Sequence, residues 1–182
     1  MTSHLQLAAP SPWVVRFAGL IRRGGTVLDL ACGSGRHALL LSARGHPVTA
    51  VDRDPEALAR LAGVRGVAAT RADLESAPWP LAGRRFDAVV VANYLHRPLL
   101  PSIREALAEG GVLLYETFMR GQEALGRPSN PDFLLEPGEL LRAFAGLCPV
   151  AFEQGRVEAP RPAVVQRLCA VKGAAAGMVR LD

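Results

Sequence analysis

Short apolar runs alternate along the chain with longer segments in which apolar residues recur at helical spacing. In the first half of the chain the apolar runs are Thr26–Leu30, Pro47–Val51, Val67–Thr70 and Phe86–Ala92. Three consecutive valines lie at the centre of the last run, which is typical of a strand buried on both faces of a parallel sheet. Strands that alternate with helices predict an α/β fold, in which helices cover both faces of the sheet.

Several of the helical segments carry start or stop signals. Ser11 followed by Pro12 is an N-cap with proline at the first helical position, and the helix that it begins is expected to end at Gly24–Gly25. Asp54–Pro55 has the same form and starts a helix that we expect to reach about Leu61. Further helices are expected from the glycine-rich turn to Leu41, over Pro101–Ala108 and over Gly138–Phe144.

The second half of the chain predicts three more strands. A turn at Gly110–Gly111 leads into an apolar run from Val112 to Phe118, and residues 119–137 form a long loop. Val150–Val157 and Ala163–Val171 are expected to pair as an antiparallel hairpin at the sheet edge. No repeat or second pattern interrupts this series, so we expect one domain over 1–182, with flexible termini at 1–10 and 173–182.

The composition adds few constraints on function. Apolar residues make up 49% and charged residues 21% of the 182 residues, as in an ordinary globular protein. The net charge is +4, and of the 21 basic residues only Lys172 is a lysine, which leaves 20 arginines (21 − 1). The arginines are dispersed, with no cluster denser than pairs such as Arg22–Arg23. A nucleic-acid interface concentrates its positive charge, so we expect no nucleic-acid partner.

The cysteines and the terminal segment point to a cytoplasmic protein. Cys32, Cys148 and Cys169 are odd in number and show no CxxC spacing, which argues against a disulfide framework and a structural zinc site. No apolar run approaches the roughly 18 residues of a membrane span, and Met1–Pro10 does not resemble a leader. We therefore expect no metal and no membrane association, and the sequence leaves the oligomeric state open.

The sharpest chemical signal is the segment Val27-Leu-Asp-Leu-Ala-Cys-Gly-Ser-Gly-Arg36. A strand bearing Asp29 leads into a Gly-x-Gly turn, and the turn leads into a helix. Gly33 and Gly35 allow the backbone to approach a ligand closely, and the N–H groups at the helix start can bind a carboxylate. Asp29 can accept a hydrogen bond from an ammonium group. The segment therefore suits both charged ends of an amino acid.

Polar residues also end the next three strands. Asp52 follows Gly33 by 52 − 33 = 19 residues, the place where a carboxylate binds a ribose diol. Asp73 follows the third strand and suits an adenine amine, and Asn93 follows the fourth. The carboxyl ends of strands are where open α/β sheets bind ligands.

These motifs resemble those of the class I S-adenosylmethionine (SAM)-dependent methyltransferases. The matching segments cover roughly residues 10–172 and are Asp29–Arg36, Asp52, Asp73–Leu74, Phe86–Asn93 and Leu107–Leu114. The resemblance implies a three-layer Rossmann-like sandwich, with a seven-stranded, mostly parallel sheet and an antiparallel last strand. It also implies SAM as cofactor, bound by Asp29, Ala31, Gly33, Gly35, Arg36, Asp52, Arg53, Asp73, Leu74 and Asn93.

Within that superfamily the chain most resembles small methyltransferases of the tellurite-resistance type. The closer similarity rests on Gly33–His37, Glu116–Phe118 and Gly126–Pro131. We expect a small-molecule acceptor, recognised by residues after the fourth strand and from the end of the fifth strand onwards, namely Tyr94, His96, Arg97, Glu116, Arg127, Asn130 and Phe133. His96 is the first candidate for a general base if the acceptor is a hydroxyl or an ammonium. A thiol or chalcogenide needs no base, and the sequence does not choose between these cases.

Three other functions compete with this interpretation. Gly33–Ala38 also fits the GxGxxA fingerprint of dinucleotide-binding oxidoreductases, although Asp29 would then point a carboxylate towards a pyrophosphate. A non-catalytic SAM-binding protein would share every binding motif. A nucleic-acid methyltransferase is disfavoured, because Asn93-Tyr-Leu-His96 lacks the Pro-Pro pair that follows asparagine in enzymes acting on base amino groups.

Overall fold

Seven strands form one sheet in the computed structural model, which describes residues 9–173. The sheet order is β3-β2-β1-β4-β5-β7-β6. The strands are β1 Val27–Leu30, β2 Val48–Asp52, β3 Val67–Arg71, β4 Phe86–Ala92, β5 Leu107–Phe118, β6 Leu147–Val157 and β7 Ala163–Lys172. The predicted flexible termini lie almost entirely outside the described residues.

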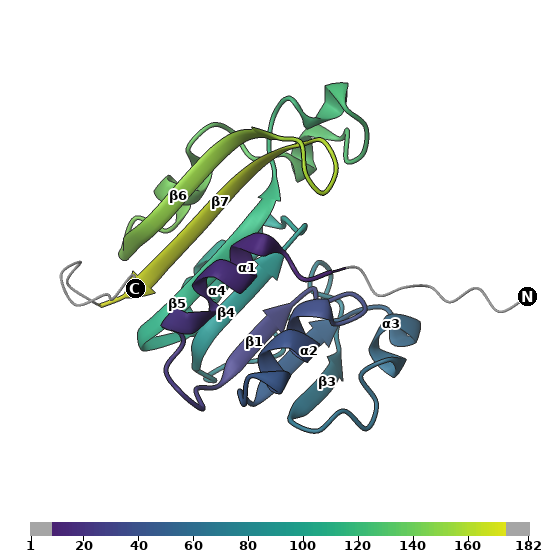
Figure 1. The fold of residues 1–182 in the computed structure, drawn as a ribbon, viewed down its shortest axis with the longest axis vertical. Coiled ribbons are helices and arrows are strands. Elements are labelled where there is room, and N and C mark those ends of the chain that lie inside the picture. Colours follow the sequence, from purple (N-terminus) through teal and green to yellow (C-terminus); the bar gives the residue numbers. More distant parts are fainter. Residues whose placement is uncertain (1–8, 174–182) are drawn as a thin grey trace, which may run out of the picture.

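The pairing confirms the predicted sheet. Strands β1 to β5 run parallel, whereas β7 is antiparallel to both of its neighbours, β5 and β6. The hairpin β6–β7 therefore forms one edge of the sheet, as expected, and Figure 1 shows it extending beyond the parallel strands.

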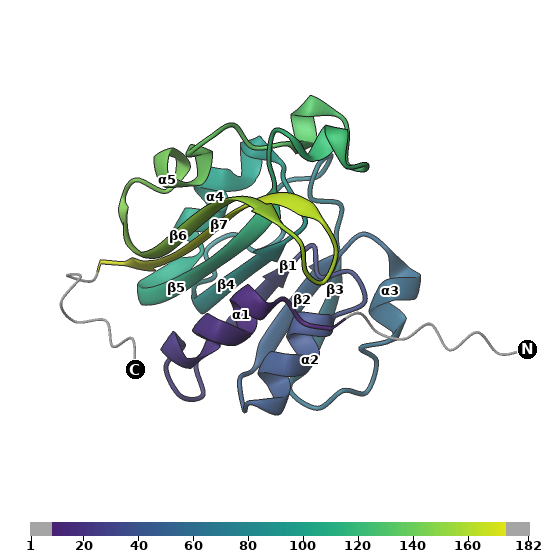
Figure 2. The same cartoon turned by 45° about the horizontal axis from the view of Figure 1, so that its top comes forward.

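Helices cover both faces of the sheet, which gives three layers. They are α1 Pro12–Phe17, α2 Arg36–Ala43, α3 Pro55–Ala59, α4 Leu100–Glu105 and α5 Glu139–Ala143. Helices α1, α2 and α3 pack on the face that carries Val90 and Leu114, and α4 and α5 pack on the face that carries Val89 and Tyr115. Figure 2 shows α1 and α2 on one side of the strands and α4 and α5 on the other. No helix within residues 9–173 is long and apolar enough to cross a bilayer.

The fifth strand begins earlier than the sequence predicts. We expected a helix over Pro101–Ala108 and a turn at Gly110–Gly111, but α4 ends at Glu105 and β5 already starts at Leu107. Leu107 pairs with Phe86, and the register shifts before the next pair, so the glycines lie in an irregular part of the strand. A Cβ on Gly111 would lie 2.7 Å from the carbonyl oxygen of Ala108, so only glycine permits this close passage.

The first helix is also shorter than expected. It ends at Phe17 and continues as one 3₁₀ turn, Ala18–Leu20, instead of reaching Gly24–Gly25. The helix ends there because Ile21 adopts an extended backbone. The Ile21 side chain is buried in the core on the α1 face of the sheet. The long loop 119–137 is present as predicted and contains two 3₁₀ turns, η3 Gln122–Ala124 and η4 Pro131–Phe133.

Candidate functional site

The carboxyl ends of β1, β2, β3 and β4 meet at one edge of the sheet, because these strands are parallel and in register. The residues that directly follow β1 and β4 have a strained backbone. Ala31 has φ 53° and Asn93 has φ 58°, and they are the only non-glycine residues with positive φ in the described part of the chain. Such left-handed conformations cost about 1–3 kcal/mol for ordinary residues and cluster at functional sites.

The two glycines of the turn after β1 have different roles. Gly33 has φ 54°, and a Cβ added there would meet no atom within 4 Å, so this position faces open space at the sheet edge. Gly35 has φ 80°, and a Cβ there would overlap the Leu61 side chain. Gly33 thus leaves room for a ligand, whereas Gly35 is needed for packing of the turn against the helix layer.

Asp52 connects the ends of β1 and β2. Its Oδ2 accepts a 2.7 Å hydrogen bond from the Gly33 N–H, and its Oδ1 accepts a 3.0 Å bond from the Asp54 N–H. Both oxygens keep lone pairs for further donors, because a carboxylate accepts about four hydrogen bonds. The side chain is therefore held in place at the sheet edge while it remains able to bind a ligand.

Asp29 and Arg36 lie differently from the sequence expectation. The Asp29 carboxyl is buried, and its Oδ2 accepts a 2.9 Å bond from the Ala38 N–H in the first turn of α2. Burial raises the pKa of this carboxyl to about 7. Arg36 donates a 3.0 Å hydrogen bond to the carbonyl oxygen of Ala9. In this structure the two residues hold α2 and the N-terminal segment, and neither lines the cavities described next.

The first cavity opens at this edge. Its lining residues are Ala31, Asp52, Arg53, Ala72, Asp73, Leu74, Glu75 and Tyr94. Six of these carry a predicted role, whereas Ala72 and Glu75 were not anticipated, because nothing in the pattern separates them from ordinary loop residues. Asp73 is oriented by bonds from the Ser76 hydroxyl at 2.6 Å and the Glu75 N–H at 3.0 Å, and the Ser76 bond is the main reason that its pKa is lowered.

The chemistry of this cavity fits the adenosine part of SAM. Its carboxylates can accept hydrogen bonds from a ribose diol and from an exocyclic amine. Ala31, Ala72 and Leu74 provide apolar surface for a flat base. The cavity is lined by three acidic residues and by one basic residue, Arg53. This excess of negative charge also favours a positively charged ligand.

Two further cavities continue the crevice. The second, of about 240 Å³, is lined by Glu75, Asn93, Tyr94, Leu95, Thr117, Phe118, Pro128 and Phe133. The third, of about 460 Å³, is lined by Asn93, Phe118, Arg127, Pro128, Ser129, Asn130, Phe133 and Arg161. Glu75 and Tyr94 border both the first and the second cavity, and Asn93 and Phe133 border both the second and the third. The three spaces therefore follow one another along the sheet edge.

Comparison with known families finds one matching domain. Residues 27–111 match the family model described as a methyltransferase domain, and this stretch contains the glycine turn, Asp52, Asp73 and Asn93. Residues 27–111 therefore carry a methyltransferase domain, and the rest of the chain is compared through its fold. No curated protein sequence matches the chain.

Solved structures show the same fold. TehB from Haemophilus influenzae superposes with a TM-score of 0.77 at 21% identity, covering 91% of this chain and 63% of TehB. The chain thus spans less than two thirds of the length of TehB. A TehB-like SAM-dependent methyltransferase from Corynebacterium glutamicum gives a TM-score of 0.65 at 21% identity, covering 88% and 86% of the two chains. A structure described under the conversion of a disulfide bond into a thioacetal group during echinomycin biosynthesis gives a TM-score of 0.68 at 22% identity, covering 93% of this chain and 85% of the other.

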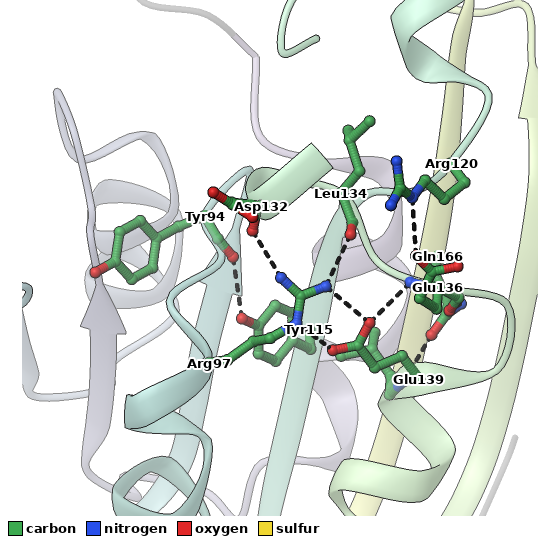
Figure 3. Close-up of polar contacts among 10 residues, drawn as sticks. Tyr94, Arg97, Tyr115, Arg120, Asp132, Leu134, Glu136, Glu139 and Gln166 are labelled. Atoms are coloured by element: carbon green, nitrogen blue, oxygen red, sulfur yellow. Dashed lines mark hydrogen bonds and ion pairs between the residues drawn. The ribbon is translucent and has the colours of Figure 1, made fainter. Parts of the chain in front are cut away.

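Tyr94 separates the first two cavities. Its backbone carbonyl accepts a 3.0 Å bond from the Tyr115 hydroxyl, and its ring points away from that contact (Figure 3). The Tyr94 hydroxyl is buried and has no hydrogen-bond partner among the described residues. Burial, reinforced by the nearby charges of Glu75 and Asp73, raises the pKa of this phenol to about 12. The Tyr94 hydroxyl, neutral and with an unused hydrogen-bond donor, therefore lies between the first and the second cavity.

Arg97, predicted to bind the acceptor, instead clamps the loop 119–137 (Figure 3). It forms two hydrogen bonds with the Glu139 carboxylate, at 2.7 and 3.0 Å. It also donates to the carbonyl oxygens of Asp132 at 2.7 Å and Leu134 at 2.9 Å. Four of its five N–H donors are thus used, and Arg97 lines none of the three cavities.

Glu116 and His96 also lie away from the cavities. Glu116 is buried and forms an ion pair with Arg167, whose guanidinium lies 5.9 Å from the centre of the Trp13 ring. Side chains alternate along a strand, so Glu116 points with Leu114 to the α1 face. His96 is half-buried and lines none of the three cavities. Tyr94, Arg127, Asn130 and Phe133 are the members of the predicted acceptor set that border the crevice.

The described residues offer no obvious metal centre. Within 9–173, no three or more His, Cys, Asp or Glu side chains are grouped so that they could hold a metal ion. Cys32, the cysteine nearest the site, is buried, and burial raises the pKa of its thiol. Its thiol therefore stays protonated and is a poor nucleophile.

Proposed function

We propose that this methyltransferase acts on a small-molecule acceptor that binds in the crevice beyond Tyr94. The observation that carries this proposal is the shared lining of the cavities. Glu75 and Tyr94 border both the acidic cavity that fits SAM and the cavity beneath the loop 119–137. An acceptor in the second cavity would thus lie next to the cofactor. The volumes of 240 and 460 Å³ are of the size that small ligands occupy.

Within this proposal the carboxylates at the strand ends bind the cofactor. Asp52, held by the Gly33 N–H, accepts bonds from the ribose diol, and Asp73 with Leu74 contacts the base. Gly33 leaves open space for the part of the cofactor that crosses the turn. SAM supplies an electrophilic methyl group. Asp29 does not contact the cofactor in this proposal. It positions the site indirectly, because it fixes the first turn of α2.

The residues of the second cavity would orient the acceptor and exclude water. Phe118 and Phe133 provide apolar walls, and Asn93 offers an amide at the end of β4. Methyl transfer requires the acceptor atom to be held in line with the methyl group, so positioning is the main task of the protein. If the acceptor must lose a proton, Glu75 is the carboxylate that lines both cavities, and it replaces His96 as the first candidate for the base.

The alternatives are less well supported. A dinucleotide-binding oxidoreductase does not agree with the match to a methyltransferase domain. A non-catalytic SAM-binding protein has no need for the second and third cavities beside the cofactor site. Dispersed arginines continue to favour a small molecule over nucleic acid as acceptor. The three free cysteines, Cys32, Cys148 and Cys169, support a reducing, cytoplasmic location.

A two-stage experiment tests the proposal. Calorimetric titration first measures the affinities for SAM, for its demethylated product and for NAD, and we expect binding of the first two only. A mass-spectrometric screen then follows methyl transfer to oxygen, nitrogen, sulfur and selenium acceptors and, as a separate arm, to RNA and DNA. Methylation of nucleic acid with no transfer to any small molecule would refute the proposed acceptor class.

A further inference from the structure

The crevice reverses its charge from one end to the other. The first cavity is lined by Asp52, Asp73 and Glu75 against one arginine. The third cavity is lined by Arg127 and Arg161, and no acidic residue borders it. An electrostatic field of this kind orients a ligand that is itself charged at one end.

The two arginines are available to a ligand. Both side chains are exposed, and neither makes a hydrogen bond or an ion pair through its guanidinium with any residue in the described range 9–173. By contrast, Arg22, Arg97 and Arg167 each pair with a carboxylate. Arginine binds carboxylates and phosphates through parallel hydrogen bonds, and Ser129 and Asn130 in the same lining add a hydroxyl and an amide.

A buried glutamine holds the two arginine-bearing segments together. Arg127 lies in the loop 119–137, and Arg161 lies in the turn between β6 and β7, at the same end of the sheet (Figure 1). Gln122 donates a 3.2 Å bond from Nε2 to the carbonyl oxygen of Arg127. Its Oε1 accepts a 2.9 Å bond from the Val164 N–H at the start of β7. The arginine pair thus rests on a fixed framework that links the loop to the hairpin.

The space between the cofactor cavity and the arginines is apolar. Phe118, Pro128 and Phe133 border both the second and the third cavity, and Phe133 is 47% exposed although it is a large aromatic residue. An exposed phenylalanine beside a cavity is suited to cover an apolar ligand. A ligand that spans the crevice would therefore contact aromatic surface first and the arginines last.

We propose that the methyl acceptor is an amphiphilic small molecule, with an apolar body against Phe118 and Phe133 and an anionic group, carboxylate or phosphate, held by Arg127 and Arg161. This inference rests on the proposed function, because it places the acceptor in the same crevice. It specifies the class of acceptor by its charge and leaves the methylated atom open.

Binding of three matched probes tests the proposal. Protein saturated with the demethylated product of SAM is titrated calorimetrically with phenylacetate, phenyl phosphate and the neutral phenylacetamide. We expect at least one anion to bind ten-fold or more tightly than the amide, and the stronger anion identifies the group that the arginines prefer. Arg127→Gln and Arg161→Gln should each weaken that anion at least five-fold and change the affinity for phenylacetamide less than two-fold.

Arg44→Gln is the matched control. Arg44 is an exposed arginine at the C-terminal end of α2, at the opposite edge of the sheet, and its substitution should leave all three affinities unchanged. Equal binding of amide and anions, no binding of any probe, or anion binding that is insensitive to both arginine substitutions would overturn the proposal. Failure of the cofactor itself to bind, measured in the first titration, would instead overturn the proposed function.

Discussion

The backbone N–H of Gly33, in the turn after β1, donates a 2.7 Å hydrogen bond to Oδ2 of Asp52, which ends the neighbouring strand β2, 19 positions further along the chain. This bond joins the glycine turn to the acidic edge of the first cavity. The same carboxylate also accepts from the Asp54 N–H, so both of its oxygens are oriented before any ligand arrives. A carboxylate that is already oriented in this way loses little conformational freedom when a ligand binds.

Asp52→Ala should therefore weaken SAM binding more than it weakens the fold. Loss of charge-assisted hydrogen bonds to a ribose diol costs about 2–4 kcal/mol, or roughly 30- to 1,000-fold in affinity. The bonds lost within the protein should lower the free energy of unfolding by only about 1–2 kcal/mol. Calorimetric titration and urea unfolding measure the two effects separately.

Asp54→Asn provides the matched control for this prediction. Asp54 is an exposed acid two residues away that caps α3 by accepting a 2.9 Å bond from the Glu56 N–H. Asparagine caps helices as well as aspartate does, so neither SAM affinity nor stability should change appreciably. Equal affinities of wild type and a folded Asp52→Ala variant would remove Asp52 from the cofactor site.

The two glycines of the turn should respond in opposite ways to substitution. Gly33→Val places a side chain in open space, so we expect a folded protein that has lost SAM binding at least 100-fold, with a stability cost of about 1–2 kcal/mol for the left-handed backbone. Gly35→Ala should instead destabilise the fold by about 2–3 kcal/mol, because the methyl group overlaps Leu61 at φ 80°. Thermal unfolding and SAM titration of both variants distinguish the roles. Normal SAM affinity in Gly33→Val would mean that the cofactor does not cross this turn.

Local signals were sufficient to predict the first four parallel strands. The strand predicted at Phe86–Ala92 is observed with the same bounds, because its apolar run and the residues that flank it are short-range features. The motif Asp29–Arg36 likewise predicted a strand, a turn and a helix in the correct order. At Gly110–Gly111 the same approach failed, since glycines that allow a strand to pass close to its neighbour resemble glycines that form a turn.

Local sequence signals could not predict which partners the charged side chains contact. Arg97 was assigned to the acceptor because it follows β4, but its partner Glu139 lies 42 residues further along the chain. Glu116 pairs with Arg167, 51 residues away, on the face that α1 covers. Arg161 had no local signal at all, and only the pairing of β6 with β7 brings it to the crevice. Such placements depend on tertiary contacts, which a single sequence does not show.

The clamp formed by Arg97 predicts a large effect on stability. Arg97→Ala leaves the half-buried Glu139 carboxylate and two carbonyl oxygens without their donor, and we expect a loss of about 2–4 kcal/mol in the free energy of unfolding. Arg156→Ala is the control, because the Arg156–Glu158 pair is exposed on both sides and should contribute at most about 1 kcal/mol. Urea denaturation measures both. If the Arg97→Ala variant were fully stable but had reduced turnover, Arg97 would instead be assigned to binding of the methyl acceptor.

We predict that the protein loses stability in acid because His37 is buried in its neutral form. Its Nε2 accepts a 3.1 Å hydrogen bond from the Ser11 N–H, and the ring is 2% exposed in the first turn of α2. Burial, with a smaller effect from the Arg36 charge, lowers the pKa of this imidazole from 6.5 to about 3. Between these values the unfolded chain binds a proton that the folded protein does not. The contribution of His37 is therefore complete above pH 6.5 and is lost as the pH falls towards 3.

The His37→Gln variant isolates this contribution, because the glutamine amide oxygen can still accept the Ser11 N–H but does not titrate. Each unit of pKa shift corresponds to about 1.36 kcal/mol, so wild type should lose roughly 3 kcal/mol more than the variant between pH 7 and pH 4. Urea unfolding at unit steps of pH measures the difference. The raised pKa of Asp29 has the opposite effect on stability, but it is common to both proteins and cancels in the comparison. Parallel curves for the two proteins would show that His37 takes up its proton at the same pH in the folded protein as in the unfolded chain, and the Ser11 N–H would then need another acceptor.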